Sequence, residues 1–407
     1  MQHTKLKSHP EKGHKLSFDN TEIAFRGKSN ADLERAYWLF KIISINFLTR
    51  IGPPITNLAL KLGLPIKPLI KSTIYRHFCG GESIAECEQT VRQLDAGGVG
   101  SILDYSIEGE DDESVFDATC QEIMKTIRHA DGDERIPLTV FKVTGLVRLA
   151  LLEKKDANKP LDSSETAEYQ RWKDRVNQIC GLAHELGVPV MIDAEESWIQ
   201  DSIDTLSIEM MRRYNQEKVL VFNTYQLYRN DKLASLMADH KLASAEQFFL
   251  GAKLVRGAYM EKERERALEY NYPSPIHESK EATDTDYDQA LKYCISHIEE
   301  ISFVAGTHNE NSCRVLAELL DEKGIPHDHE HVHFSQLLGM SDNLSFNLAA
   351  AGYNVVKYVP YGPVESVMPY LFRRAEENTS VAGQMGRELK LISKEKKRRI
   401  LIDQVRS

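Results

Sequence analysis

Residues 250–259 have the sequence LGAKLVRGAY, a short apolar run that passes into polar residues and precedes a segment with helical spacing. Eight apolar runs of this kind, rich in Val, Ile or Leu, are separated along the chain by longer segments with helical periodicity. Such alternation is typical of βαβ units and a parallel sheet. The expected strands are Val99–Tyr105, Leu138–Val143, Val188–Asp193, Val219–Tyr225, Leu250–Val255, Phe303–Thr307, Val332–Leu338 and Asn354–Val359.

Eight strand and helix units in roughly 290 residues favour an α/β fold, a distorted (βα)8 TIM-type barrel with an N-terminal helical region, over an open doubly wound sheet. No G-x-G-x-x-G fingerprint follows the first strand, and the chain contains no P-loop. A bound dinucleotide would therefore lack a Rossmann-type site. The expected helices include Glu165–Leu186, Asp201–Gln216, Ser279–Glu300, Asn311–Lys323 and a final helix after Met368.

Composition narrows the class of protein. The 407 residues are 42% hydrophobic and 28% charged, which excludes a chain that is mainly disordered. A formal net charge of -10 argues against nucleic acid as a partner and favours a small molecule. The 6 cysteines show no C-x-x-C or zinc-finger spacing, and the N-terminus lacks the apolar core of a signal peptide. These features predict a cytoplasmic protein with reduced thiols.

The chain is expected to divide into three parts: residues 1–90 form a polar segment and a helical region, residues 91–385 form the barrel, and residues 386–407 form a basic C-terminal tail. The stretch from Arg35 to Gly81 holds seven basic residues and no acidic residue among apolar runs. Its helices are too short to span a bilayer. Two interpretations stay open: peripheral membrane contact through Arg35–Arg76, or a structural cap on the barrel.

Polar residues stand at the expected carboxyl ends of the strands, where barrels of this type build their active sites. Alternation places Lys253 on the same strand face as Gly251 and Val255. Lys253 is expected to point into the barrel lumen, because the helix layer would bury its charge without a partner. The candidate strand-end residues include Asp104, Lys142, Asp193, Asn223, Thr307, His308, Asn309 and Tyr358.

The last predicted helix carries a second group of candidate site residues. Its residues Tyr370, Arg373, Arg374 and Glu377 are spaced i, i+3, i+4 and i+7, so they share one face. Two adjacent guanidinium groups form a fork that suits a planar carboxylate. The spacing therefore predicts a small carboxylic acid as ligand.

A tract of four histidines between His327 and His333 resembles a metal-binding sequence. Its period of two would set the imidazoles in a row along one strand face, which suits a closed metal site poorly. We expect a polar loop there and no metal site in the protein.

The motifs KLVRGAY at 253–259, DAEE at 193–196, THN at 307–309, and YVPYGP at 358–363 followed by YLFRRAEE at 370–377 resemble the proline dehydrogenase family of flavoenzymes. The resemblance runs from about Gly98 to Asn378 in the order of the family's motifs. It implies a monofunctional enzyme that binds FAD noncovalently. Such an enzyme oxidises L-proline to Δ1-pyrroline-5-carboxylate and passes electrons to a membrane quinone, from the inner face of the inner membrane.

Residue roles follow from the same resemblance. Asp193, Lys253 and Tyr358 would be catalytic, with Lys253 where bacterial bifunctional members carry arginine near flavin N5. The substrate would be bound by Lys142, Tyr370, Arg373, Arg374 and Glu377. The flavin would be lined by Ala194, Asn223, Lys253, Val255, Gly257, Ala258, Thr307, His308, Asn309 and Leu337, and Arg256 matches a basic position.

Three alternatives stay open at this point. The first is a hydroxyproline dehydrogenase of the same family, although the hydroxyproline branch carries a smaller residue at the position of Tyr358. The second is a metal-dependent barrel hydrolase that uses His308, Asp193 and Glu195. The third is a barrel without enzymatic activity that docks to membranes.

Overall fold

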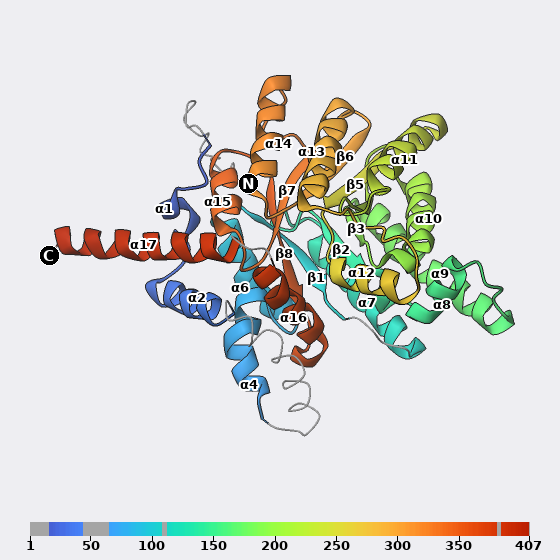
Figure 1. The fold of residues 1–407 in the computed structure, drawn as a ribbon, viewed down its shortest axis with the longest axis horizontal. Helices are drawn as coiled ribbons and strands as arrows, with labels where there is room; N and C mark the ends of the chain where they lie inside the picture. The colour runs from blue at the N-terminus through green and yellow to red at the C-terminus, as the bar shows by residue number, and fades with distance from the viewer. Residues whose placement is uncertain (1–15, 44–64, 108–111, 381–383, 407) are drawn as a thin grey trace.

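The computed structural model describes residues 16–43, 65–107, 112–380 and 384–406. Its centre is one parallel sheet of eight strands, in the order β1-β8-β7-β6-β5-β4-β3-β2, and Figure 1 shows helices arranged around it. All eight predicted strands are present, so the barrel prediction is confirmed. The strands are β1 Gly100–Tyr105, β2 Thr139–Lys142, β3 Val190–Asp193, β4 Val221–Gln226, β5 Leu250–Val255, β6 Ile301–Gly306, β7 Val332–Leu337 and β8 Val355–Tyr361.

The barrel is closed everywhere except between β1 and β2, which share no strand ladder. One backbone bond joins this seam just before β2, from Ser101 N–H to the carbonyl of Arg135 at 2.8 Å. Pro137 follows directly, and proline has no N–H to continue a ladder. The seam is one of the two distortions of the barrel.

The helix layer follows the predicted order. Helix α9 begins with a capping box between Asp162 and Glu165 and ends at Gly187, whose φ of 68° is the left-handed conformation that glycine adopts readily. The outer helices are α6 Ile84–Asp95, α7 Glu113–Ala130, α8 Leu149–Asp156, α9 Ser163–Leu186, α10 Ser197–Tyr214, α11 Lys232–Glu246, α12 Met260–Glu269, α13 Lys280–Ser296, α14 Glu310–Lys323 and α15 Asp342–Ala350, and a short 3-10 turn, η2 Val143–Gly145, follows β2.

The second distortion lies at the end of the barrel sequence. Helix α6, which precedes β1, packs on β1 and β8. Helix α16, Val364–Ser380, follows β8 but packs on N-terminal helices and on α17, Gln384–Arg406. Helix α16 begins four residues before Met368, earlier than predicted, and α17 is a further helix where only a basic tail was expected.

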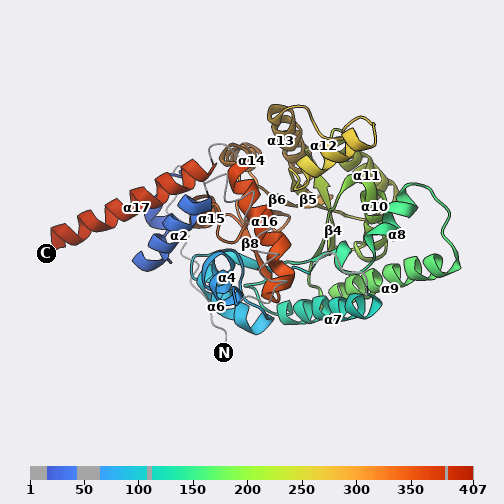
Figure 2. The same cartoon turned by 60° about the horizontal axis from the view of Figure 1, so that its bottom comes forward.

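The N-terminal helices form a second apolar core with α16 and α17. Leu33 and Phe40 of α2 pack in one cluster with Leu371 of α16 and Ile392 of α17. Figures 1 and 2 both show α17 extending from this region away from the barrel. The N-terminal elements are α1 Thr21–Ala24, α2 Asn30–Ile43, α4 Lys67–Ile70, η1 Lys71–Tyr75 and α5 Arg76–Phe78.

Several basic residues of the predicted membrane stretch have acidic partners from other parts of the chain. Lys67 pairs with Glu365 of α16, and Lys71 pairs with Glu82. Arg50 and Lys61 lie outside the described residues. No helix in the described ranges has the length and apolar composition needed to cross a membrane. The membrane contact and the division of the chain at residues 90 and 385 stay predictions.

Candidate active site

Asp193, the last residue of β3, lies between two ammonium groups. Lys142 Nζ at the end of β2 donates to Asp193 Oδ2 at 2.7 Å, and Lys253 Nζ of β5 donates to Oδ1 at 2.5 Å. Lys142 and Asp193 are register partners, so their side chains project on the same side of the sheet. Three residues predicted from three strands thus form one buried ion cluster, and Lys253 points into the lumen as expected.

The charges of this cluster are set by burial and by one another. Burial by itself would raise the pKa of Asp193, but the charges of Lys142 and Lys253 outweigh it and lower this pKa to about 2. Burial also lowers the pKa of Lys253, an effect that Asp193 opposes. Asp193 is therefore an anion at neutral pH and holds two cations in place rather than accepting a proton.

Tyr358 of β8 completes the cluster from the opposite side of the lumen. Its hydroxyl lies 3.4 Å from Asp193 Oδ1, and Lys253 Nζ lies 4.6 Å from the centre of its ring. Burial and the charge of Asp193 hold the pKa of Tyr358 well above its usual value, so the phenol is neutral. The only hydrogen bond that Lys253 forms with a described residue goes to Asp193, although an ammonium has three donors.

The lumen beneath the cluster is filled by apolar side chains. Residues from several strands form this layer, and none of them is more than 7% exposed: Ile102, Leu138, Val140, Met191, Phe222, Val304, Val356 and Tyr358. The floor is packed and dry. A ligand can therefore reach Lys253 only from the carboxyl ends of the strands.

The rim beside Lys253 is formed by the residues that follow β5. Arg256 is fixed by hydrogen bonds to Asp284 at 2.8 Å, Thr307 at 2.7 Å and Ser312 at 2.9 Å. Gly257 has a φ of +135°, and a Cβ there would lie 2.4 Å from the ring of Tyr228. Only glycine fits this position.

The flavin-lining candidates on this rim differ in exposure. Val255 and Ala194 are half-buried, whereas Gly257 and Ala258 present exposed backbone. Exposed backbone beside a buried ammonium suits a planar ligand laid across the barrel mouth.

His308 follows β6 and is held by the loop after β7. Its Nδ1 lies 2.9 Å from the hydroxyl of Ser341. Burial, with the charges of Lys357 and Arg374 adding to it, lowers the pKa of His308 to about 3, so its imidazole is neutral. Next to it, Asn309 caps α14 by accepting hydrogen bonds from the N–H groups of the second and third residues after it.

Helix α16 carries the predicted substrate-binding face. Arg374 is 7% exposed, and its guanidinium lies 5.0 Å from the centre of the Tyr370 ring, which is itself buried. Arg373 is half-buried. The charge of Arg374 contributes to the low pKa of His308, which brings α16 within electrostatic reach of the end of β6. The side chain of Glu377 lies outside the described residues.

Asn223 is not placed with the other candidates. Its register partners are Ile192 and Ala252, which face the helix layer, whereas Thr224 is the register partner of Lys253. The Asn223 amide donates to Asp204 of α10 at 2.9 Å. The structure therefore directs this side chain away from the lumen. Leu337 of β7, in contrast, packs against the lumen layer.

Two further groups lie beside the candidate site: Glu195, which the sequence suggested only as part of a hydrolase site, and Ser341, which it did not suggest. Glu195 is 2% exposed and accepts hydrogen bonds from Thr144 at 3.0 Å and Tyr259 at 2.5 Å. Ser341, the partner of His308, is a non-glycine residue with a φ of 51°. The DAEE motif pointed to Glu195, whereas nothing in the sequence marked Ser341, because its conformation is imposed by its surroundings.

The histidines of the predicted polar loop have protein partners. The His327 ring stacks on Tyr353 with centroids 4.1 Å apart and lies 2.8 Å from Asp321 Oδ1, while His331 Nδ1 lies 2.7 Å from the carbonyl of Ile298. These contacts account for His327 and His331 through local packing.

A search against protein-family profiles matches residues 87–387 to the profile described as proline dehydrogenase. The chain belongs to the proline dehydrogenase family. The matched range contains every residue of the ion cluster and of the arginine face. This membership makes the protein an oxidoreductase and excludes the hydrolase and the inactive scaffold as alternatives.

Curated relatives carry the family name. "Proline dehydrogenase 1, mitochondrial" from Dictyostelium discoideum is 34% identical, over 96% of this chain and 76% of its own length. The human protein of the same name is 43% identical, over 58% of this chain and 40% of its own length. The proline dehydrogenase chain described here thus spans less than half of the human relative in that match.

A solved structure of proline utilization A from Bdellovibrio bacteriovorus has the same fold. It superposes with a TM-score of 0.70 and 20% sequence identity, covering 93% of this chain and 42% of that chain. At this identity the likeness establishes the proline dehydrogenase barrel fold alone.

Proposed function

We propose that this proline dehydrogenase oxidises L-proline to Δ1-pyrroline-5-carboxylate with noncovalently bound FAD. The observation that carries the proposal is the Lys142–Asp193–Lys253 cluster at the barrel mouth, together with Arg373 and Arg374 on α16, where the charge of Arg374 acts on His308 at the end of β6. Fixed cations at the end of a dry lumen suit a small anionic substrate and a reaction that gathers negative charge on a cofactor.

The residues at the mouth fit FAD. Lys253 has an ammonium that is 7% exposed and forms one hydrogen bond with the described protein, so it retains donors for an acceptor atom of the ring. The exposed backbone at Gly257 and Ala258 allows close approach. We expect the flavin to be held by Lys253 with Ala194, Val255, Gly257, Ala258, Thr307, His308, Asn309 and Leu337, and the assignment of Asn223 depends on a side-chain rearrangement.

The chain's own residues would bind and orient the substrate. Arg373 and Arg374 would hold the proline carboxylate as a fork, and Tyr370, which lies under the Arg374 guanidinium, would form one wall of the ring pocket. When bound, FAD would supply a two-electron acceptor for the hydride of the ring carbon on the side of nitrogen away from the carboxylate, and the N–H proton would be released to solvent. Fixing the carboxylate at the far end of proline orients that carbon, which lowers the entropy loss of reaction.

Lys253 and Tyr358 would exclude water and hold charge. The ammonium lies over the Tyr358 ring and is fixed by Asp193, so it needs no reorganisation to stabilise negative charge that develops beside it. Glu377 would orient one of the two arginines, and Lys142 would support the carboxylate end.

A hydroxyproline substrate is the second candidate within the family. Tyr358 disfavours it, because the phenol fills the lumen between Asp193 and Met191, at 3.4 Å and 3.8 Å. A ring hydroxyl on the substrate would need this volume. We therefore propose L-proline as the preferred substrate.

We also propose a cytoplasmic location, peripheral contact with the inner face of the inner membrane and a membrane quinone as electron acceptor. All six cysteines are buried free thiols, which is compatible with a reducing compartment. The quinone is implied by the resemblance alone.

Anaerobic titration of the purified protein with L-proline tests the proposal. We expect bound FAD to give a yellow protein whose visible absorbance bleaches on addition of L-proline, and to a much smaller extent with 4-hydroxyproline. A colourless protein that takes up no FAD on reconstitution would refute the cofactor assignment. Stronger bleaching by hydroxyproline than by proline would make the second candidate correct.

A further inference from the structure

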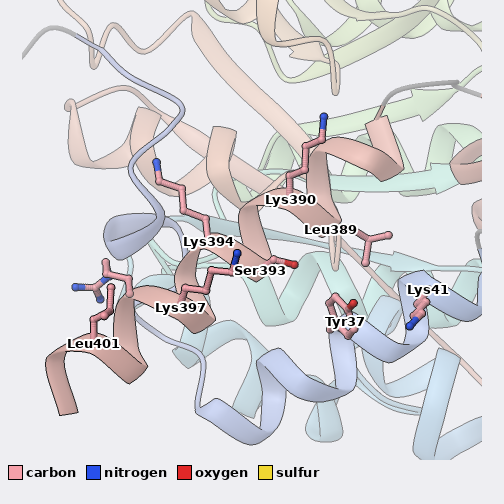
Figure 3. Close-up of a pocket in the computed structure, with 9 residues that line it drawn as sticks. Tyr37, Lys41, Leu389, Lys390, Ser393, Lys394, Lys397 and Leu401 are labelled. Atoms are coloured by element: carbon pink, nitrogen blue, oxygen red, sulfur yellow. The ribbon is translucent and has the colours of Figure 1, made fainter. Parts of the chain in front are cut away.

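A groove between α2 and α17 lies outside the candidate active site. Its volume is about 720 Å³, and it is lined by Tyr37 and Lys41 from α2 and by residues of α17. Figure 3 shows that Lys390, Lys394 and Lys397 all come from α17, which lies opposite the segment carrying Tyr37 and Lys41. We call this feature the α2/α17 groove.

The groove is strongly cationic because of the spacing of lysines on α17. Lys390, Lys394, Lys397 and Leu401 stand at i, i+4, i+7 and i+11, which places them on one helix face. Helix α17 contains eight basic and three acidic residues, in a chain whose net charge is -10. The positive charge of the molecule is therefore concentrated here.

Half of the eight basic residues of α17 pair with described acids, but the three groove lysines of this helix, Lys390, Lys394 and Lys397, do not. Lys390 and Lys397 are exposed and form no ion pair with any described residue. Lys394 donates to the carbonyl of Asp19 at 2.8 Å, which leaves its charge uncompensated. Arg398, at the edge, does pair with Glu395 and with Glu22. The groove favours an anionic partner.

Apolar side chains continue the cationic surface. Trp38 and Ile42 on α2 are 50% and 52% exposed, and Ile400, Leu401 and Val405 on α17 are 54%, 62% and 88% exposed. No described side chain after Glu395 is buried, and the end of α17 extends away from the body in Figures 1 and 2. Cations thus lie next to apolar side chains that are at least half exposed, and Lys41 Nζ itself lies 4.7 Å from the centre of the Trp38 ring.

We propose that the α2/α17 groove binds the headgroups of anionic phospholipids, with the apolar end of α17 inserted at the boundary of the acyl chains. An interfacial helix presents this combination of Lys, Arg, Trp and Leu to a membrane. A soluble anion would leave the apolar side chains exposed, and a second copy of the chain would bring positive charge against positive charge. The inference rests on the proposed membrane contact and moves it from the whole of Arg35–Arg76 to α17 and the part of α2 that carries Tyr37 and Lys41.

Flotation of the full-length protein with vesicles tests the proposal. We expect binding to phosphatidylcholine vesicles that contain phosphatidylglycerol, little binding to phosphatidylcholine alone, and weaker binding as salt is raised. The double variant Lys390→Gln/Lys397→Gln should lower the partition coefficient roughly 30-fold. This loss is the sum of two roughly equal contributions, one from each lysine near the anionic surface. The double variant Lys241→Gln/Lys292→Gln, which removes two exposed lysines from α11 and α13, should bind like the wild type.

A second variant tests the apolar part. Leu401→Ser/Val405→Ser should weaken binding without changing its dependence on salt, because it removes no charge. Equal vesicle binding by wild type and the Lys390/Lys397 variant would overturn the proposal. So would binding to polyglutamate but not to vesicles, which would indicate an acidic protein as partner. Proline oxidation with a soluble dye should be unchanged in all these variants. Absence of proline oxidation in the wild type would count against the proposed function and not against the groove.

Discussion

Two buried aspartates in this molecule are each held by a pair of lysines, one on each side of β8. The first pair lies in the lumen, and the second joins β8 to α15 and the N-terminal segment. Both carboxyl groups have a pKa below the usual value because the lysine charges outweigh burial. The lysines are Lys142 and Lys253 around Asp193, and Lys28 and Lys357 around Asp342.

The two pairs differ in how many hydrogen-bond acceptors surround one of their lysines, Lys357 in the second pair and Lys253 in the first. Lys357 is 0% exposed and donates to the carbonyls of Leu337 at 3.2 Å and Met340 at 2.6 Å, and to Asp342 at 2.9 Å. Its three donors have three acceptors. Lys253 is equally enclosed but donates only to Asp193 among described residues. A saturated buried ammonium stabilises the fold, whereas an unsaturated one is available to a ligand.

The largest expected effect is on folding. Lys357→Met leaves the Met340 carbonyl without its donor, removes one of the two donors of the Leu337 carbonyl and takes one cation from buried Asp342. We therefore expect the free energy of unfolding to fall by about 3–5 kcal/mol. Lys253→Met should cost at least about 2 kcal/mol less, because no backbone carbonyl loses a partner. Urea unfolding of both variants measures the difference. Equal losses would show that saturation does not distinguish the two lysines.

The next effect is on catalysis, where we expect Lys253 to matter more than Lys357. Lys253→Met should lower kcat for proline about 10²–10³-fold, the usual cost of removing one fixed donor from developing charge. The visible spectrum of bound flavin should shift as well, since a charge beside the ring is lost. Steady-state kinetics and absorbance provide the two readouts. A variant with wild-type kcat and an unshifted spectrum would place Lys253 with the structural lysines.

The third prediction tests whether the arginines of α16, which belong to neither lysine pair, bind the ligand. Arg373→Met and Arg374→Met should each raise KM for proline by one to two orders of magnitude, since a charged hydrogen bond contributes roughly 1.5–3 kcal/mol. Turnover should fall too, and flavin content should stay normal. Arg212→Met, which removes an exposed partner of Glu246, is the control. Unchanged KM values in both variants would make these arginines structural or flavin-facing.

The last effect concerns an acid at the edge of the second pair. Glu388 of α17 accepts the Ser341 N–H at 2.6 Å, and burial, with the charge of Asp342 adding to it, raises the Glu388 pKa from 4.5 to about 7. The folded state holds this proton more tightly, so the contribution to stability is present below about pH 4.5 and is lost as the pH rises through about 7.

Glu388→Gln removes this titration while keeping an acceptor for Ser341. The free energy of unfolding of the wild type should therefore fall relative to the variant by about 3 kcal/mol between about pH 4.5 and about pH 7. Chemical unfolding at a series of pH values measures it. A difference that does not depend on pH would mean that Glu388 titrates normally and that the second pair does not raise its pKa.

The same comparison explains what the sequence could predict. Strand alternation was sufficient for Lys253, because the parity of one strand decides whether its side chains face the lumen. Lys357 and Tyr358 are neighbours on β8 with opposite parity, and the motif drew attention to the tyrosine only. Lys357 shares its acid, Asp342, with Lys28, and the charge of Glu388 acts on it as well; no local pattern connects these positions.

Orientation at the ends of strands was harder to predict than strand position. Asn223 was assigned to the lumen by resemblance, yet its register with Ala252 directs it to Asp204 in the helix layer. Basic residues near the N-terminus appeared unpaired because their stretch contains no acid, but Glu82 and Glu365 supply partners from outside it. Strand register and long-range ion pairs depend on tertiary packing, which cannot be inferred from the composition of a segment.

The exchange of α6 for α16 in the barrel wall affects how the catalytic part could be isolated as a fragment. A gene fragment that began at β1 would omit α6, and with it Cys87, Val91 and Leu94, which are buried in the main core. The outer side of β1 and β8 would then face water, and the fragment would aggregate through its exposed apolar surface. An autonomous folding unit must also include Gly80, whose N–H donates to the carbonyl of Pro360 at 2.8 Å. Expression fragments of this protein should therefore start upstream of residue 80.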